Sequence, residues 1–266
     1  MKKTLIALAA AAAAAASCSV MAAASGTPGA WLPNGSVGLL QLGGTLTPQE
    51  KTTPWEINPG GPAGNLNGFV QKGQQDVVIH VETAIPVLGI RPQQKEPFTG
   101  EPGIAPQIDF KGAIDPAQFS GNGTATLTLD IKDSQSKKIG RLQVPLFAGA
   151  EYSYTGRSSG KSYMTARNPG DAFYGGLSQA SEPVGGNIYT RVSNISYAFI
   201  ANYNDQGAPL ASGSYSDPMS DNRYKFSAYY GSGIEAGSKI NITLDAPATS
   251  EAIAWKASLP VSVSYQ

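Results

Sequence analysis

The strongest constraint on this chain is a series of short segments in which apolar and polar residues alternate. Residues 74–88 (QQDVVIHVETAIPVL) place Val77, Ile79 and Val81 on one face, and residues 124–133 (TATLTLDIKD) repeat the pattern. A period of two is typical of a β-strand with one buried face. Further segments of strand character follow: KIGRLQVPLFAGAEYSY at 138–154, IYTRVSNISYAFIANY at 188–203, RYKFSAYYGSGI at 223–234, SKINITLDA at 238–246 and AWKASLPVSVSY at 254–265.

Turn-forming residues separate these segments. The chain holds 31 glycines and 19 prolines, and only 14% of its residues are charged, which suits a many-turned β protein. Between residues 155 and 187 the alternation gives way to Gly, Ser and Asn with scattered aromatic residues. We therefore predict an all-β fold, with one β-sandwich over residues 44–266 and an inserted, mostly loop subdomain at about 150–230.

Residues 1–24 have the pattern of a secretory signal. Lys2 and Lys3 precede an alanine-rich apolar run, and small residues allow cleavage after Ala22 or Ala24. The run is too short and too weakly apolar for a membrane-spanning helix. Cys18 raises the alternative of a lipoprotein signal, but the residues before it lack the usual large aliphatic side chain. The pattern predicts an exported protein.

The charge balance and the residue counts exclude several functions. Without Lys2 and Lys3 the chain keeps 17 basic against 19 acidic residues and has no basic cluster, which argues against a nucleic-acid partner. His80 is the only histidine and the exported part has no cysteine, so the usual transition-metal ligand sets and a cysteine nucleophile are absent. We expect no metal and no cofactor.

Hydrolytic chemistry has little support either. A serine triad would need His80, and no GxSxG turn presents a serine. A glycosidase needs two carboxylates at a set separation, and the acidic residues of the middle region lie in polar segments where carboxylates are usually solvated. A glycan hydrolase remains a remote alternative, and we predict that the chain is not an enzyme.

The two ends of the exported chain carry the most informative strands. Residues 31–47 (WLPNGSVGLLQLGGTLT) are apolar and interrupted by glycine, and have no hairpin partner beside them. Their apolar residues change face near residues 39–40, which implies a bulge or two consecutive strand segments. At the other end the chain finishes on an alternating strand that carries Leu259, Val261, Val263 and Tyr265. Residues 31–47 are either the first strand of this sandwich or a strand meant for another molecule.

With both ends in view, the chain resembles the subunits of chaperone–usher fimbriae, most of all the Fae-type major and minor subunits and adhesins of enterotoxigenic Escherichia coli. The resemblance runs over the whole exported chain, and the order and spacing of its pieces carry it. Extra apolar residues at 39–41 depart from the family pattern and leave the register of the N-terminal strand open. The matching pieces are NGSVGLLQLGGTLT, IAPQIDF, KIGRLQVPLFAGAEYSY, FYGGL, YGSGIEAGSKINITL and AWKASLPVSVSYQ.

The resemblance implies an incomplete immunoglobulin-like sandwich whose last strand a partner supplies. A periplasmic chaperone would fill the resulting groove by pairing with the C-terminal strand that carries Leu259, Val261, Val263 and Tyr265. At the outer-membrane usher, the N-terminal extension of the next subunit (residues 25–43) would replace the chaperone strand. The side chains that would enter the groove are those of Val37, Leu39, Leu40 and Leu42. Repetition of this contact between neighbouring subunits gives a fibre on the cell surface.

The resemblance also implies a second role, the binding of host glycans by the inserted region. Aromatic rings beside hydrogen-bonding groups suit the apolar face and the hydroxyl rim of a sugar. The alternative from another class is a self-contained, secreted lectin-like β-sandwich that keeps residues 31–47 as its own first strand. The candidate glycan-binding residues are Tyr152, Tyr154, Tyr163, Arg167, Phe173 and Tyr174.

Overall fold

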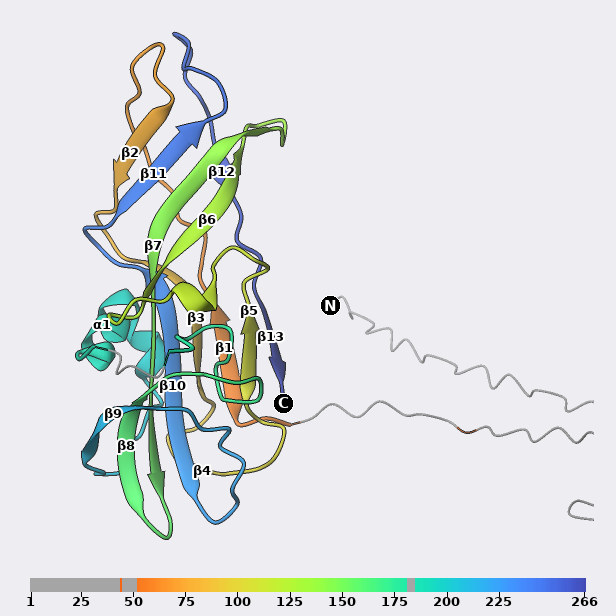
Figure 1. Cartoon of the computed structure of the whole chain (residues 1–266), viewed down its shortest axis with the longest axis vertical. Helices are drawn as coiled ribbons and strands as arrows, with labels where there is room; N and C mark the ends of the chain where they lie inside the picture. Colours follow the sequence, from red (N-terminus) through yellow and green to blue (C-terminus); the bar gives the residue numbers. More distant parts are fainter. Residues whose placement is uncertain (1–43, 45–51, 181–184) are drawn as a thin grey trace, which may run out of the picture. The chain divides into compact units, whose positions relative to one another are not determined.

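The computed structural model describes residue 44, residues 52–180 and residues 185–266 of the chain. Strands dominate this part, as the alternating segments predict, and the all-β fold class is confirmed (Figure 1). Two sheets contain the strands. The smaller sheet joins only β5 (Pro106–Asp109) and β13 (Ser262–Tyr265).

The larger sheet has 11 strands. These are β1 (Trp55–Pro59), β2 (Asp76–His80), β3 (Ile85–Pro92), β4 (Phe98–Thr99), β6 (Thr124–Lys132), β7 (Lys138–Thr155), β8 (Ser159–Met164), β9 (Leu210–Tyr215), β10 (Lys225–Ile234), β11 (Lys239–Leu244) and β12 (Lys256–Ala257). The main hydrogen-bonded path runs β1-β3-β10-β7-β11-β2. Three short helical segments complete the described chain: η1 (Pro116–Gln118), α1 (Ile188–Ile195) and η2 (Tyr197–Ile200).

Strand β7 organises the fold, because its 18 residues pair with different neighbours along its length. Near its start it lies between β6 and β11, and further along it lies between β10 and β8 (Figure 1). Pro145 falls between the last β11 pair at Gln143 and the first β10 pair at Phe147, where β7 is paired only with β6. Since proline has no backbone N–H to donate, this gap tolerates it at low cost.

The alternating strands bury the faces that the sequence indicates. Ile79, Leu127 and Ile131 are buried, whereas Val78 and His80 on the opposite face are exposed. The strand predicted over residues 74–88 is divided into β2 and β3, and the β11 and β10 strands also agree with the sequence prediction. The sandwich core therefore forms where a period of two is clearest.

The strand predicted for residues 188–203 is wrong, because this segment forms α1 and η2. Ile188, Val192 and Ile195 are buried together with Phe199 and Ile200, a spacing of three and four residues that puts them on one helix face. These side chains pack on Phe147 and Tyr229 of the sheet as a second apolar cluster. The β-branched residues of the segment resemble those of a strand, but their spacing fits a helix.

A row of three glycines in the sheet makes room for this helical cover. Gly89, Gly231 and Gly149 are cross-strand neighbours on β3, β10 and β7. A Cβ at Gly89 would lie 2.0 Å from Phe199, one at Gly231 would lie 2.4 Å from Val192, and one at Gly149 would lie 2.7 Å from Ile188. Glycine inside a strand often marks such a close approach, and here it lets α1 and η2 lie directly on the backbone.

Replacing Gly231 by alanine is expected to lower the free energy of unfolding by about 1–3 kcal/mol, because the new methyl group overpacks the contact with Val192. Urea denaturation followed by tyrosine fluorescence measures this loss. Gly186→Ala is the matched control, since nothing lies within 4 Å of a Cβ at that position. Equal stability of the two variants would show that α1 does not rest tightly on the glycine row.

Candidate functional site

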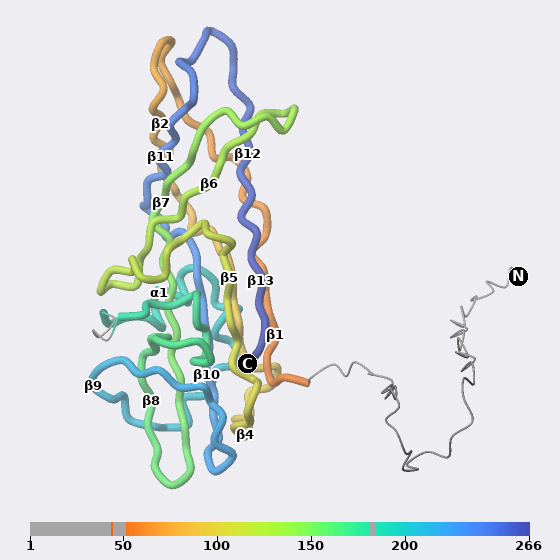
Figure 2. Tube along the Cα trace, turned by 45° about the vertical axis from the view of Figure 1, so that its right-hand side comes forward, coloured from red at the N-terminus to blue at the C-terminus, as the bar shows by residue number. Residues whose placement is uncertain are grey.

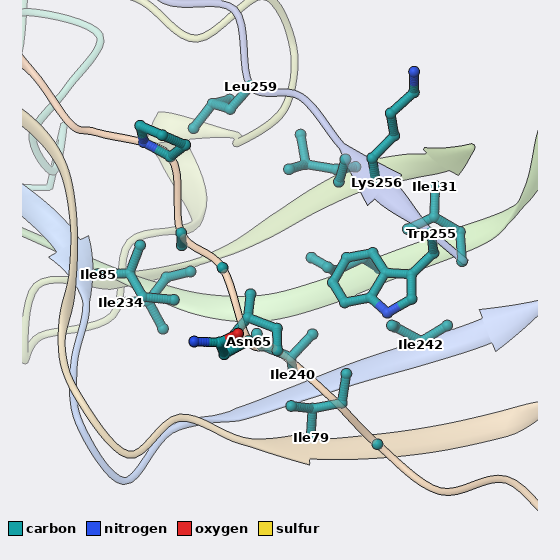
Figure 3. Close-up of a pocket in the computed structure, with 18 of the residues that line it drawn as sticks. Asn65, Ile79, Ile85, Ile131, Ile234, Ile240, Ile242, Trp255, Lys256 and Leu259 are labelled. Atoms are coloured by element: carbon teal, nitrogen blue, oxygen red, sulfur yellow. The ribbon is translucent and has the colours of Figure 1, made fainter. Parts of the chain in front are cut away.

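The described part of the chain contains an apolar groove of about 1430 Å³. Its floor consists of the inward faces of β2, β6, β7 and β11, and β3 and β10 close one end (Figure 3). Figure 3 shows Ile79, Ile131, Ile240, Ile242 and Trp255 gathered in the groove, and Ile85 and Ile234 at its end. Glu251 and Lys256 are the only charged residues in the lining, and the Lys256 side chain extends away from the apolar groups.

The C-terminal residues 255–263 form one rim of the groove. Gln266 exchanges two backbone hydrogen bonds with Ala105, of 3.0 and 3.1 Å. This pair shows which residues of β13 turn their backbone N–H and C=O groups toward β5. Because antiparallel ladders alternate, Ser264 and Ser262 direct their backbone groups toward β5, while Tyr265, Val263 and Val261 direct theirs to the other side. No described residue hydrogen-bonds to the backbone on that side, so this edge of β13 is unpaired.

Residues 61–70, which connect β1 to β2, form the opposite rim, and we call them the connecting segment. They have no regular secondary structure, and only Leu66 and Val70 are partly buried against the core. In Figure 2 the connecting segment continues upward from β1, and the C-terminal segment runs down into β13. The second layer of the sandwich therefore has two rims with a gap between them.

The side chains around this gap are only half-buried. Residues that would be covered in a complete sandwich remain partly accessible to water, although they pack against the main core. The floor strands beneath them are held together by the β6-β7-β11-β2 ladders of the large sheet. These partly buried residues are Leu66, Val70, Val77, Ile85, Val87, Leu129, Trp255, Ala257, Leu259, Val261 and Val263.

Of the two sets of strand residues predicted from the sequence, only the C-terminal set can be placed relative to the groove. Leu259, Val261, Val263 and Tyr265 all face the core from alternate positions, and the first three line the groove. The residues predicted to enter a partner's groove, Val37, Leu39, Leu40 and Leu42, lie outside the described residues. The floor was not singled out from the sequence, although its members are the alternating apolar residues of four predicted strands.

The candidate glycan-binding residues do not lie together in the structure. Phe173 is 0% exposed between Trp55 and Tyr230, and Tyr152 is 5% exposed, so neither offers a free ring face. Tyr154 stacks on Tyr152, whereas Tyr163 belongs to the opposite face of the sheet and packs on the cluster beneath α1. Tyr174 is half-buried and Arg167 is exposed in the segment that follows β8. Aromatic residues in this region mostly fill the core.

A buried carboxyl lies under the helical cover. Tyr203 donates a hydrogen bond of 2.7 Å to Oε1 of Glu151, which is 5% exposed. Burial raises the pKa of Glu151 above its usual value of 4.5, and the Tyr203 hydroxyl lowers it in part. The site therefore favours the protonated form of Glu151 more than water does.

The stability of the wild-type protein is expected to fall as the pH rises above about 4.5. Protonated Glu151 contributes fully to the free energy of unfolding at a pH where the carboxyl is protonated in both the folded and the unfolded protein. This contribution is lost as the pH rises through the raised pKa of Glu151 in the folded protein. Glu151→Gln keeps a hydrogen-bond acceptor for Tyr203 and should flatten this part of the profile. Thermal unfolding between pH 4 and pH 8 tests it, with exposed Glu82→Gln as control. An unchanged pH profile in Glu151→Gln would contradict the assignment.

Metal and membrane sites find no support in the residues that the structure describes. No group of three or more His, Cys, Asp or Glu side chains there could hold a metal ion. None of the described helices is long and apolar enough to cross a membrane.

Comparison with known proteins identifies the family of the chain. A family model described as "Fimbrial, major and minor subunit" matches residues 1–266. The chain is 28% identical to the K88 fimbrial protein AC and 28% identical to the F41 fimbrial protein, both of Escherichia coli, over 100% of each chain. It is equally similar, at 28%, to the K88 fimbrial protein AD of the same species.

The chain belongs to this family of major and minor fimbrial subunits, because the family model covers its whole length. It is a structural subunit of a fimbrium and not an enzyme, and it assembles with neighbouring subunits in a fibre at the cell surface.

Proposed function

We propose that the groove receives an extended strand from a neighbouring subunit, and that repetition of this contact builds the fibre. The observation that carries the proposal is the unpaired edge of β13 above an apolar floor. An extended peptide can add to such an edge through its backbone, while alternate side chains enter the groove. Each aliphatic side chain that becomes well buried contributes roughly 1.5–3 kcal/mol.

The donor in this proposal is the N-terminal extension, residues 25–43, of another subunit. Its apolar residues Val37, Leu39, Leu40 and Leu42 match the uncharged floor of the groove. Each subunit then offers a strand at one end and a groove at the other, which is a head-to-tail contact that does not close on itself. Such a contact extends without limit and gives a filament.

The same groove would be filled during export by a periplasmic chaperone. An unpaired edge beside half-buried apolar residues is an aggregation hazard in an unassembled subunit. A chaperone strand that pairs with Val261, Val263 and Tyr265 would cover it until the outer-membrane usher exchanges that strand for the donor. The basic and apolar residues at positions 2–16 support the export step, since they have the pattern of a secretory signal.

The decisive experiment compares the mature chain from Ala23 with a chain that lacks residues 23–43. Both are expressed in a periplasm with and without the cognate chaperone, and recovery and size are followed by gel filtration. We expect the full chain to need the chaperone and to polymerise, and the shortened chain to remain a soluble chaperone complex. If both fold alone as stable monomers, strand exchange is excluded and a secreted lectin-like sandwich takes its place.

Host-glycan binding is the second proposal, and exposed tyrosines in the inserted region favour it. Tyr197, Tyr215 and Tyr189 expose 64%, 48% and 44% of their surface. An exposed ring can cover the apolar face of a sugar. If Tyr197 contacts a glycan, Tyr197→Ala should weaken binding to a glycan array about tenfold, with unchanged stability. Exposed Leu210→Ala is the control, and equal binding by both variants would remove Tyr197 from the site.

A further inference from the structure

Strand β1 follows the N-terminal extension in the chain, and only one of its residues is buried. Trp55 is 3% exposed, whereas the other four residues of β1 are exposed. Within the described chain β1 hydrogen-bonds to β3 alone, so it is an edge strand of the large sheet. Residues 44 and 52–54 are not buried, which makes Trp55 the first buried side chain among the described residues. Tension on the extension therefore reaches the core at Trp55.

The indole of Trp55 is attached to three other segments of the chain. Its Nε1 donates a hydrogen bond of 2.7 Å to Ile104 O inside the core. Its ring meets the rings of Phe98 and Phe173 edge to face, with centroids at 4.9 and 5.6 Å. Such edge-to-face pairs are favourable in addition to the burial of the rings. The start of β1 is thus held by its side chain as well as by the ladder with β3.

Gln93, which follows β3, holds the backbone at the same point. Its backbone N–H donates to Pro54 O at 2.8 Å. Its side-chain Nε2 donates to Thr53 O and to Trp55 O, both at 3.0 Å. A strand that is pulled from its end detaches one hydrogen bond at a time, so the bonds at that end are loaded first. Gln93 therefore supports the three carbonyls that a pull on the extension would load first.

The hydrogen-bond partner of the Trp55 indole lies next to the C-terminal strand. Ile104 precedes Ala105, whose backbone exchanges two hydrogen bonds with Gln266. The ladder between β5 and β13 continues from this pair, and β13 carries the unpaired edge above the groove. One hydrogen bond and one residue step thus lead from the strand that follows the subunit's own extension to the strand at its acceptor edge.

We propose that Trp55 and Gln93 form a mechanical anchor that carries the tension of the fibre from the N-terminal extension into β5 and β13. The inference rests on the proposed function of the groove as a strand acceptor, since that function makes the extension and β13 the two points at which neighbouring subunits pull. The load passes from a neighbour's donor strand to β13, across β5 to Ile104, and through Trp55 to the subunit's own extension. The helical cover lies outside this route, because α1 and η2 pack on a separate apolar cluster.

The experiment holds single purified fibres at constant force in an optical trap and measures the lifetime before the first lengthening step. Trp55→Phe keeps an aromatic ring but removes the N–H that pairs with buried Ile104 O. We expect its lifetime to be about tenfold shorter than that of the wild type, the change in rate that about 1.4 kcal/mol produces, which is within the range for a buried acceptor left without its partner. Gln93→Met removes two side-chain hydrogen bonds at an exposed position, and should shorten the lifetime about threefold. Because Gln93 is exposed, this variant tests the anchor even where Trp55→Phe assembles poorly.

Two control variants separate a mechanical role from a general loss of stability. Val192→Ala removes buried methyl groups beneath α1, outside the route of the load. It should lower the urea midpoint of the subunit and leave the lifetime under force unchanged. Gln94→Met makes the same substitution as Gln93→Met at the adjacent exposed residue, and should behave as the wild type does.

Three outcomes would overturn the inference. Equal lifetimes of Trp55→Phe, Gln93→Met and wild-type fibres would show that the anchor bears no load. A lifetime of Val192→Ala shortened in proportion to its loss of stability, as in Trp55→Phe, would show that overall stability sets the lifetime. Fibres formed by a chain without residues 23–43 would exclude strand exchange itself, and the route of the load with it.

Discussion

Replacing Val261 by glutamate is expected to abolish fibre assembly, with at least about a hundredfold less subunit recovered in chaperone-bound or polymeric form. Val261 is half-buried at the rim of the groove and its backbone lies at the unpaired edge. A carboxylate there would be covered by the incoming strand without a cationic partner, which costs several kcal/mol. Co-expression with the chaperone, affinity capture and gel filtration measure the recovery.

The matched control for this prediction is a glutamate substitution at the next residue, Ser262. Ser262 is exposed on the opposite side of the same strand, so Ser262→Glu adds the same charge outside the groove. We expect Ser262→Glu to assemble normally. Normal assembly of Val261→Glu as well would show that the C-terminal strand is not the docking edge, and the proposed mode of assembly would have to be abandoned.

Replacing Phe173 by alanine should lower the free energy of unfolding by about 3–5 kcal/mol, the range for removal of a buried aromatic side chain. Phe173 is 0% exposed, and its ring stacks on Tyr230 at 5.5 Å and meets the edge of Trp55 at 5.6 Å. The cavity would lie where the segment after β8 is attached to the main core. Urea denaturation of the purified subunit measures the change.

Arg167→Ala is the comparison for Phe173→Ala, because Arg167 is exposed in the same segment. It should change stability by less than about 0.5 kcal/mol. If Phe173→Ala were as stable as Arg167→Ala and lost only binding to a glycan, Phe173 would have a role in recognition that its burial does not indicate.

The strands of the sandwich were predictable because their buried and exposed faces alternate without interruption. Leu127 and Ile131 are buried on β6 as their spacing requires, and Ile240 and Ile242 are buried on β11 for the same reason. The local sequence is enough to predict a strand of this kind, since burial of one face imposes an apolar period of two residues. Pro145, which cannot donate to a ladder, lies where β7 changes partners.

The helical cover was not predictable by the same reading. Residues 188–203 contain Ile, Val, Thr and Tyr, which favour strands when considered one by one. Their burial at Ile188, Val192 and Ile195 follows the helical period, which a short segment shows only weakly. The glycines at 89, 149 and 231 could have indicated that another segment packs closely on the sheet, but nothing local identifies that segment as α1.

The candidate sites could also be predicted from the sequence only in part. The alternation of Leu259, Val261, Val263 and Tyr265 was sufficient to predict a terminal strand with one apolar face. It could not show that the opposite edge of that strand is unpaired, because a missing neighbour leaves no local pattern. For the aromatic residues of the insert the sequence was a poor guide, since a buried tyrosine and a sugar-binding tyrosine look the same in a list of residues.

The sequence by itself therefore determined the class of the fold, the positions of most strands and the apolar faces that build the core. These properties follow from local periodicity and from the need to bury apolar side chains. Only the tertiary structure decided which strands are neighbours, where the upper layer has a gap and which aromatic rings are buried. Each of these depends on contacts between segments far apart in the chain, such as Ala105 with Gln266 and Gly89 with Phe199.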